Sequence, residues 1–271
     1  MFLVQKHSFT EANGPKTKGS PKNSKMKISA VIITKNEERN IERCLRSLID
    51  VVDEIVVIDS CSTDKTAEIC QSFGVKFVAR PFAGYAATKN YGNNLAEHPW
   101  VFAIDADEAL SPKLQQSIIE LKKKPFEDVI YLVKTKTNYC GKKWINHCGW
   151  YPEIRKRFFQ KEKTFWEGDI HERLNSGGTK TKLIDADLLH YSYDSISDHL
   201  NRINLYTNII AEKSNKKAPL YKVVFSPMIN FIKIYFIKQG FRDGYYGLIV
   251  SVMSAYYTFL KYAKIRERNQ I

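Results

Sequence analysis

Residues 28–59 read ISAVIITKNEERNIERCLRSLIDVVDEIVVID, and this stretch decides the fold. Its first seven residues are apolar and mostly β-branched, as in a buried parallel strand. Residues 38–50 follow with the stripe of an amphipathic helix, formed by Ile41, Leu45, Leu48 and Ile49. Residues 54–59 predict a second strand. Strand, helix and strand with short connections predict a βαβ unit whose two strands are parallel.

The alternation continues further along the chain. Thr63 is a candidate cap for a second helix that Gly74 ends, and residues 75–79 predict a third strand. A helix over 85–97, a strand over 100–105 and a helix that opens at Ser111 and Pro112 and runs to about residue 124 complete the pattern. We therefore predict an α/β fold, with a parallel sheet covered by helices on both faces and ligands at the carboxyl ends of the strands.

Acidic residues follow three of these strands, in the segments Thr34-Lys35-Asn36-Glu37, Asp59-Ser60-Cys61-Ser62-Thr63-Asp64 and Asp105-Ala106-Asp107-Glu108. One acid at a strand end is commonly a helix cap, but three clusters in one alternating pattern favour a site. Asp105 and Asp107 are two residues apart and can share Mg²⁺ or Mn²⁺, which also binds nucleotide phosphates. Such a cation offsets the charge on a leaving diphosphate.

Other classes of site are excluded by their missing motifs. The chain has no G-x-x-x-x-G-K-[ST], so it lacks a P-loop, and no G-x-G-x-x-G follows the first strand, which argues against a dinucleotide fold. The five cysteines are scattered and form no C-x-x-C pair, which argues against a disulfide scaffold and a structural zinc site.

The net charge of +13 is concentrated at the two ends of the chain. Residues 1–27 carry six basic and one acidic side chain, residues 213–271 carry eleven and two, and the stretch between them carries 25 and 26. A balanced middle argues against nucleic acid as a partner, and basic ends favour a neutral body tethered to an anionic membrane surface. Residues 1–27 predict a disordered basic leader, and their apolar run is too short for a secretory signal, so a cytoplasmic location is expected.

The ordered motifs resemble the inverting GT-A glycosyltransferases of family 2. They are T-K-N-E after the first strand, D-S-C-S-T-D after the second, K-N-Y-G at 89–92 and D-A-D-E after the fourth. The segment W-E-G-D-I-H-E at 166–172, the pair His190-Tyr191 and a basic aromatic C-terminal tail resemble more narrowly the lipopolysaccharide core β-1,4-glucosyltransferases. The resemblance implies a GT-A fold with a Rossmann-like, mostly parallel sheet.

The resemblance also implies a nucleotide-sugar site. Asp59 would lie near the uracil, Asp105 near the ribose, Asp107 on the metal, and Lys89 near the base or diphosphate, where many relatives have Arg. His190 is a candidate second metal ligand, and its alternative is a half-buried strand histidine bonded to backbone. The full implied set is Thr34, Asn36, Glu37, Asp59, Ser62, Lys89, Asp105, Ala106 and Asp107.

Inversion in one step needs a carboxylate that takes the proton from the acceptor hydroxyl. The candidates are Glu167, Asp169 and Glu172. We favour Glu172, because the His171-Glu172 pair matches the family, and Asp169 is second. His171 would orient the carboxylate or contact the acceptor, unless it is a surface histidine.

Basic and aromatic residues lie on either side of that segment. Arg155 and Arg157 would face one side of a strand and grip an acidic or phosphorylated acceptor, unless the strand is a solvated edge. Aromatic rings can stack on sugars or fill a core, and four of them gather here: Trp144, Trp150, Tyr151 and Trp166.

The C-terminal tail begins after a helix predicted over 196–214, whose stripe is Ile196, Leu200, Ile203, Thr207 and Ile210. Residues 223–237 carry one charge and residues 244–260 carry none, with basic residues between and after them. Neither run cleanly reaches the 20 or so residues of a membrane span, although the second is near that length. In-plane amphipathic helices on anionic lipid suit the composition best, and a homodimer interface is the alternative.

We therefore expect three segments: a leader (1–27), a GT-A catalytic domain (28–214) with a nucleotide-sugar half (28–110) and an acceptor half (111–214), and a helical segment (215–271). The resemblance implies transfer of a hexose, glucose from UDP-glucose, to a lipid-linked lipopolysaccharide or lipooligosaccharide core sugar, at the inner face of the cytoplasmic membrane. The alternatives are a sugar nucleotidyltransferase, which would carry a Gly-rich loop after the first strand, and a non-catalytic basic module that binds nucleic acid or anionic lipid.

Overall fold

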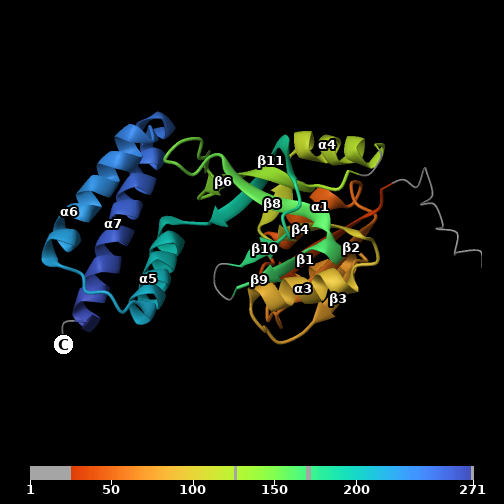
Figure 1. Ribbon diagram of the computed structural model, residues 1–271, viewed down its shortest axis with the longest axis horizontal. Coiled ribbons are helices and arrows are strands. Elements are labelled where there is room, and N and C mark those ends of the chain that lie inside the picture. The colour runs from red at the N-terminus through yellow and green to blue at the C-terminus, as the bar shows by residue number, and fades with distance from the viewer. Residues whose placement is uncertain (1–25, 125–126, 169–171, 270–271) are drawn as a thin grey trace, which may run out of the picture.

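The computed structural model describes residues 26–124, 127–168 and 172–269. Figure 1 shows a body built on a sheet and, beside it, a group of C-terminal helices that we call the helical unit. The helical unit consists of α5 (Ile196–Lys213), α6 (Leu220–Ile232) and α7 (Gly244–Asn269), with a π-helical turn (Lys233–Ile237) and a 3-10 turn (Gly240–Asp243) between the last two.

The body contains the predicted alternation and a second half that is mainly strands. Its helices are α1 (Ile41–Leu48), α2 (Thr66–Ser72), α3 (Tyr85–Leu95) and α4 (Pro112–Lys122). Its first strands are β1 (Ile28–Thr34), β2 (Glu54–Asp59), β3 (Lys76–Ala79), β4 (Trp100–Asp105) and β5 (Glu108–Leu110). The others are β6 (Ile130–Tyr139), β7 (Lys143–Trp144), β8 (Glu153–Gln160), β9 (Phe165–Glu167), β10 (Arg173–Asn175) and β11 (Thr181–Tyr193).

The main sheet is parallel in its first half and mixed in its second. In the part of the chain that the structure describes it has nine strands in the order β3-β2-β1-β4-β8-β6-β11-β5, with β7 paired to β6. The neighbours from β3 to β4 are all parallel, as the βαβ pattern predicts. β8 then lies antiparallel between β6 and β4, of which β4 is distant in sequence, and so carries its side chains next to the end of β4.

Both faces of the sheet are covered, as predicted. Side chains alternate across a strand, so Ile28, Ala30 and Ile32 of β1 pack with α1 and α4 on one face. Val31, between them, packs on the opposite face with residues of α3. Met26, two residues before the predicted boundary at 28, is also in the core, with 1% of its surface exposed.

The helix ends confirm one predicted cap and correct the other. The Ser111 hydroxyl accepts the Leu114 backbone N–H at 3.2 Å, with Pro112 in the first turn of α4. Thr63 does not cap α2, which begins at Thr66. The carboxylate of Asp64 accepts the Thr66 N–H at 3.0 Å in its place, and a charged acceptor is the stronger one.

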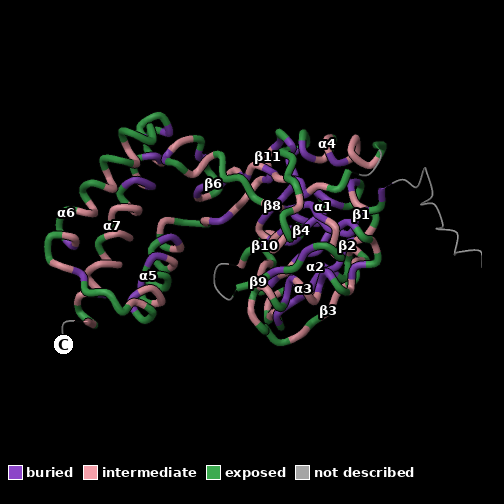
Figure 2. The backbone as a smooth tube through the Cα atoms, in the orientation of Figure 1, coloured by how far each residue is buried: buried purple, intermediate pink, exposed green. Residues whose placement is uncertain are grey.

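α5, which lies before the predicted boundary at 215, packs on α7. The Lys264 ammonium of α7 donates to side chains of Thr207 and Asn208 on α5, at 2.8 and 2.6 Å. The buried stripe of α5 also differs from the predicted one: His199 is buried, whereas Leu200 is 38% exposed. Figure 2 shows burial concentrated in the sheet and a mostly exposed or intermediate helical unit.

A buried carboxylate attaches the helical unit to the body. Asp243, just before α7, accepts backbone N–H groups of Asn146 and His147, the latter at 2.8 Å. Gly247 packs so closely on the Gly240 carbonyl oxygen that a side chain there would overlap it. By length and composition alone, one helix in the described ranges, Leu220–Ile237, could cross a membrane. The run over 244–260, expected to be nearer to that length, does not meet the same criterion.

Candidate active site

The loops after β1 and β2 are joined by side-chain hydrogen bonds. The Asp59 carboxylate, buried at the end of β2, accepts both the N–H and the hydroxyl of Ser62, at 2.8 and 2.5 Å. The Ser62 hydroxyl in turn accepts the Asn36 N–H at 2.8 Å, and the Asn36 side-chain oxygen accepts the Thr63 N–H at 2.8 Å. Three predicted nucleotide-site residues are thus held together at one edge of the sheet.

Thr34 and Glu37 lie at the same edge. The Thr34 hydroxyl is buried and finds no hydrogen-bond partner within the described ranges. Burial raises the pKa of Glu37, the Asn40 amide and the more distant Arg202 oppose that rise, and Asp107 adds to it. An acid with a raised pKa beside another acid marks a place where a cation is favoured.

The K-N-Y-G motif of α3 positions the other side of the site. Asn90 exchanges two hydrogen bonds with the backbone of Trp166, each at 2.8 Å. Gly92 lies against Val31 and Ile58, where a larger residue would displace these core side chains. The motif therefore fixes α3 both to the sheet and to the segment that carries the proposed base, and it aims Lys89 between them.

A chain of ion pairs crosses the end of β4. The Lys89 ammonium lies 3.2 Å from Asp105 Oδ1 and 2.8 Å from Glu172 Oε1. On the opposite side Arg157 Nη2 lies 3.2 Å from Asp105 Oδ2 and 2.5 Å from Glu108 Oε1. Burial alone would raise the pKa of Asp105, but Lys89 and Arg157 outweigh it and hold that pKa well below its ordinary value.

Asp107 and His190 form a second pair at the same edge. His190 Nε2 lies 3.2 Å from Asp107 Oδ2, and the β5–β11 pairing brings the two segments together. Burial would lower the pKa of His190, but the bond to Asp107 and its charge raise it above the ordinary value. Ala106 is buried between the two aspartates. The histidine therefore bonds a carboxylate, which argues against the alternative of a histidine bonded to backbone.

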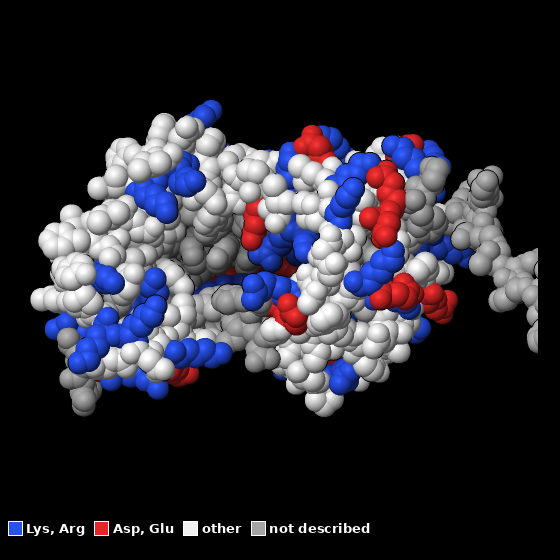
Figure 3. Space-filling model, in the orientation of Figure 1, with Lys and Arg blue, Asp and Glu red and all other residues white. Residues whose placement is uncertain are grey.

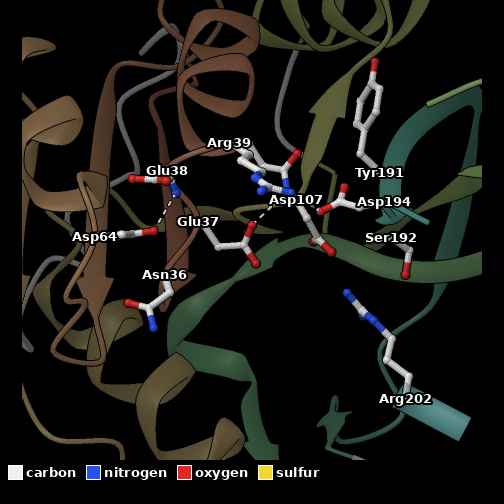
Figure 4. Close-up of a pocket in the computed structure, with 11 residues that line it drawn as sticks. Asn36, Glu37, Glu38, Arg39, Asp64, Asp107, Tyr191, Ser192, Asp194 and Arg202 are labelled. Atoms are coloured by element: carbon white, nitrogen blue, oxygen red, sulfur yellow. Dashed lines mark hydrogen bonds and ion pairs between the residues drawn. The ribbon is translucent and has the colours of Figure 1, made fainter. Parts of the chain in front are cut away.

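Two cavities flank these ion pairs. The first, which we call the rim pocket, has a volume of about 280 Å³ and contains five acidic and two arginine side chains (Figure 4). It is lined by Asn36, Glu37, Glu38, Arg39, Asn40, Asp64, Asp107, Tyr191, Ser192, Asp194 and Arg202. The second, the tryptophan pocket, has a volume of about 340 Å³. It is lined by Lys89, Ile154, Arg155, Lys156, Arg157, Trp166, Glu172, Arg173 and Leu174.

The favoured base Glu172 lines the tryptophan pocket, one ammonium group away from Asp105. Glu167, the third candidate, is exposed and accepts a hydrogen bond from Asn175 at 3.2 Å. Asp169 and His171 lie outside the described residues, so their predicted roles stay predictions. Of the described candidates, Glu172 is the one that the ion pairs hold beside the acidic rim.

Two predicted acceptor residues have other surroundings than expected. Arg157 is 3% exposed and pairs with Asp105 and Glu108 on β8, which is an interior strand and not a solvated edge, and its acceptor contact stays a prediction. Arg155 is exposed and pairs with Glu153 at 2.6 Å. Trp166 is 8% exposed and packs edge-to-face on Phe159, which favours the core alternative over an open sugar platform.

Several site residues escaped the sequence interpretation. Glu108 was noted as part of D-A-D-E, but its buried pairing with Arg157 depends on β8 lying beside β4. Arg39 and Asp194 pair at 3.5 Å across the rim pocket, from segments 155 residues apart. Arg202 has the spacing of an ordinary surface arginine on an amphipathic helix, so no local signal identifies it.

Known proteins are similar to this chain in sequence. The model of the family "Glycosyl transferase family 2" matches residues 29–178. The lipopolysaccharide core biosynthesis glycosyltransferase LpsC of Rhizobium meliloti is 31% identical, over 91% of this chain and 94% of its own. An uncharacterized glycosyltransferase of Rickettsia typhi is 30% identical, over 89% and 87%.

Solved structures show a more partial likeness. Glucosyl-3-phosphoglycerate synthase from Mycobacterium tuberculosis, solved with Mn²⁺ and UDP-glucose, is 26% identical with a TM-score of 0.34, over 42% of this chain and 44% of its own. The family model covers more than half of the chain, and the relatives match it nearly end to end. The chain therefore belongs to glycosyltransferase family 2, and it is a glycosyltransferase whose mixed sheet with flanking helices is consistent with the GT-A fold.

Proposed function

We propose that this protein transfers a hexose, glucose from UDP-glucose, to a lipopolysaccharide or lipooligosaccharide core sugar with inversion. The observation that carries the proposal is the arrangement at the end of β4, where Asp107 faces the rim pocket and Asp105 is joined through Lys89 to Glu172 in the tryptophan pocket. A leaving diphosphate and an attacking hydroxyl need such neighbouring but separate places. The core acceptor is supported by the name of the relative LpsC, and glucose by the resemblance of W-E-G-D-I-H-E.

Family membership decides between the alternatives that the sequence left open. A nucleotidyltransferase or a non-catalytic basic module would not match the glycosyltransferase model over residues 29–178.

A divalent cation suits the rim pocket. Asp107 and His190 supply a carboxylate oxygen and an imidazole nitrogen 3.2 Å apart, which are ligands that Mn²⁺ and Mg²⁺ sites use. No group of three or more potential ligands occurs in the described ranges, so phosphate oxygens and water would complete the coordination. The bound cation would offset the negative charge of the departing diphosphate.

Different residues of the chain would bind the nucleoside, contact the ribose and accept the proton. Asp59, Asn36 and Ser62 form the joined edge at which the nucleoside would bind, and Asp105 would meet the ribose. Glu172 would accept the proton of the acceptor hydroxyl as that oxygen attacks the anomeric carbon. Its bond to Lys89 holds the carboxylate in place before the acceptor arrives.

The helical unit would hold the enzyme on the inner face of the cytoplasmic membrane. Large apolar side chains of α6 and its continuation are 48–70% exposed: Leu220, Tyr221, Val224, Phe225, Met228, Ile229, Ile232, Phe236 and Ile237. α5 and α7 end side by side, and basic residues gather there. Figure 3 shows few acidic residues among them. Apolar side chains in the headgroup layer and Lys or Arg against anionic lipid are the features of an in-plane helix.

A panel of nucleotide sugars tests the donor without the acceptor. With Mn²⁺ present, UDP-glucose is expected to raise the melting temperature and to be hydrolysed slowly, whereas ADP-glucose and GDP-mannose are not. A panel in which no UDP-sugar stabilises the protein would refute the proposed donor.

Vesicle co-sedimentation tests the membrane. Binding is expected to vesicles rich in phosphatidylglycerol and to fall when Phe236 and Ile237 are both changed to Ser. The control Leu183→Ser removes an exposed apolar side chain, 43% exposed, from β11 of the body and should bind like wild type. If the protein does not co-sediment with vesicles and is a dimer in solution, the homodimer alternative is favoured.

A further inference from the structure

Arg202 enters the rim pocket from outside the body. It belongs to α5, and Figure 4 shows its guanidinium extending into the pocket toward Asp107 and Ser192. Arg202 Nε donates to both carboxylate oxygens of Asp198, one turn earlier on the helix, at 3.2 and 3.1 Å. These are its hydrogen bonds to the described residues, so the two terminal nitrogens are not engaged by them.

Arg202 differs from Arg39, the other arginine of the pocket, in the charges that surround it. Arg39 pairs with Asp194, and both of these side chains are largely exposed. Burial lowers the pKa of Arg202, but Asp198, then Tyr193 and then Asp107 raise it, and Arg202 in turn opposes the rise of the Glu37 pKa. A cation thus stands across the pocket from the acids at which the divalent cation is proposed.

We propose that Arg202 binds the diphosphate of the nucleotide-sugar donor. The two free nitrogens of a planar guanidinium match a pair of phosphate oxygens, which a single ammonium cannot do. Its position across from Asp107 would place the diphosphate between the arginine and the cation site. A positive charge held there also stabilises the diphosphate as it leaves. This inference rests on the proposed function and assigns a residue to its donor site.

Arg202 lies in the helical unit, beyond the part of the chain that the family model matches. The family model ends at residue 178, so its match says nothing of β11 or α5. α5 packs on α7 within the helical unit, and the Ser195 hydroxyl caps its first turn at 3.0 Å from the Asp198 N–H. The helical unit would therefore supply part of the donor site as well as a membrane surface.

Binding of UDP and of uridine to Arg202→Gln tests the inference. With Mn²⁺ present, the affinity for UDP is expected to fall about 10- to 100-fold, the size expected for charge-assisted hydrogen bonds. Uridine has no phosphate, so its affinity, followed by NMR titration, should change less than about 3-fold. Arg202→Lys keeps the charge without the fork and should fall between wild type and Gln.

Arg46 offers a matched control. Like Arg202 it pairs with an acid one turn earlier, Glu42, and its guanidinium lies 5.5 Å from an aromatic ring, against 5.4 Å for Arg202 and Tyr193. Arg46 is not in the rim pocket, so Arg46→Gln should bind UDP like wild type.

The outcomes separate this inference from the proposed function. If Arg202→Gln binds UDP like wild type, or loses UDP and uridine equally, the diphosphate role is wrong while the donor stands. If wild type binds GDP and not UDP, the proposed donor is wrong, and the same comparison with GDP and guanosine decides Arg202. If wild type binds no nucleoside diphosphate, both proposals fail.

Discussion

The ammonium of Lys89 lies 2.8 Å from the carboxylate of Glu172, although 83 residues separate them in the chain. Lys89 is 7% exposed and also contacts Asp105, so this one side chain joins the acid proposed for the ribose to the proposed base. The pair fixes where Glu172 stands relative to the end of β4. The first prediction follows from that position.

Glu172→Gln should keep donor binding and lose transfer, because an amide can still bond to Lys89 but cannot accept a proton. We expect turnover, measured as UDP release with a lipopolysaccharide core acceptor, to fall by about 10² to 10⁴. The UDP affinity should stay within about 3-fold. The matched variant is Asp169→Asn: if it is inactive while Glu172→Gln turns over normally, the base is Asp169.

Asp107→Ala should remove the part of UDP binding that depends on the divalent cation, because the variant lacks the proposed carboxylate ligand. Calorimetric titration of UDP with and without Mn²⁺ measures that part. Asp194→Ala is the control, since Asp194 lines the same pocket but pairs with Arg39. Equal affinities of Asp107→Ala and wild type in Mn²⁺ would refute the metal role.

Arg157→Met should destabilise the fold strongly, because Glu108, whose side chain is 1% exposed, would lose its partner in the interior. Breaking a buried ion pair on one side costs about 3–5 kcal/mol. Arg155→Met, two residues away on the same strand, removes an exposed arginine and should change the free energy of unfolding by no more than about 0.5 kcal/mol. Urea denaturation compares the two, and similar losses would contradict the buried pairing.

Gly247→Ala should destabilise the protein, although alanine normally favours a helix by about 1 kcal/mol over glycine. The new methyl group would overlap the Gly240 carbonyl oxygen, and backbone cannot rotate away as a side chain can. We expect a loss at or above the upper end of the roughly 1–3 kcal/mol typical of overpacking. In Gly92→Ala the crowded atoms are side chains of Val31 and Ile58, so a smaller loss in thermal denaturation is expected.

Acid should destabilise the protein through His199. Burial, aided by Arg202 and opposed by Asp198, lowers the pKa of His199 to about 4 from an ordinary 6.5. In the folded protein the His199 ring is therefore neutral, and its Nδ1 lies 2.9 Å from the Tyr139 hydroxyl. In the unfolded chain the same ring takes up a proton below about pH 6.5. Stability is full above that pH and falls as the pH is lowered toward 4.

The expected contribution is about 2 kcal/mol between pH 7 and pH 5. Urea denaturation at both pH values should therefore show a larger drop for wild type than for His199→Gln, which has no ring to protonate. Equal drops would mean that His199 is not held neutral by the fold.

The sequence by itself determined the alternating half of the fold and the acidic edge. Strand and helix periodicity is local, and the carboxyl ends of parallel strands necessarily meet, so Asp59, Asp105 and Asp107 could be placed together. Single caps could be predicted less securely: Ser111 is confirmed as a cap and Thr63 is wrong, because neighbouring acceptors compete for the same N–H groups.

Only the tertiary structure decided which charges pair and which segment completes each pocket. β8 crosses from a distant part of the chain into the middle of the sheet, which buries Arg157 against Asp105 and Glu108. The packing of α3 aims Lys89 at Glu172, and the docking of α5 on α7 sets the direction of Arg202. Pairings of this kind depend on how separate elements pack in space. The spacing of residues within one element does not predict that packing.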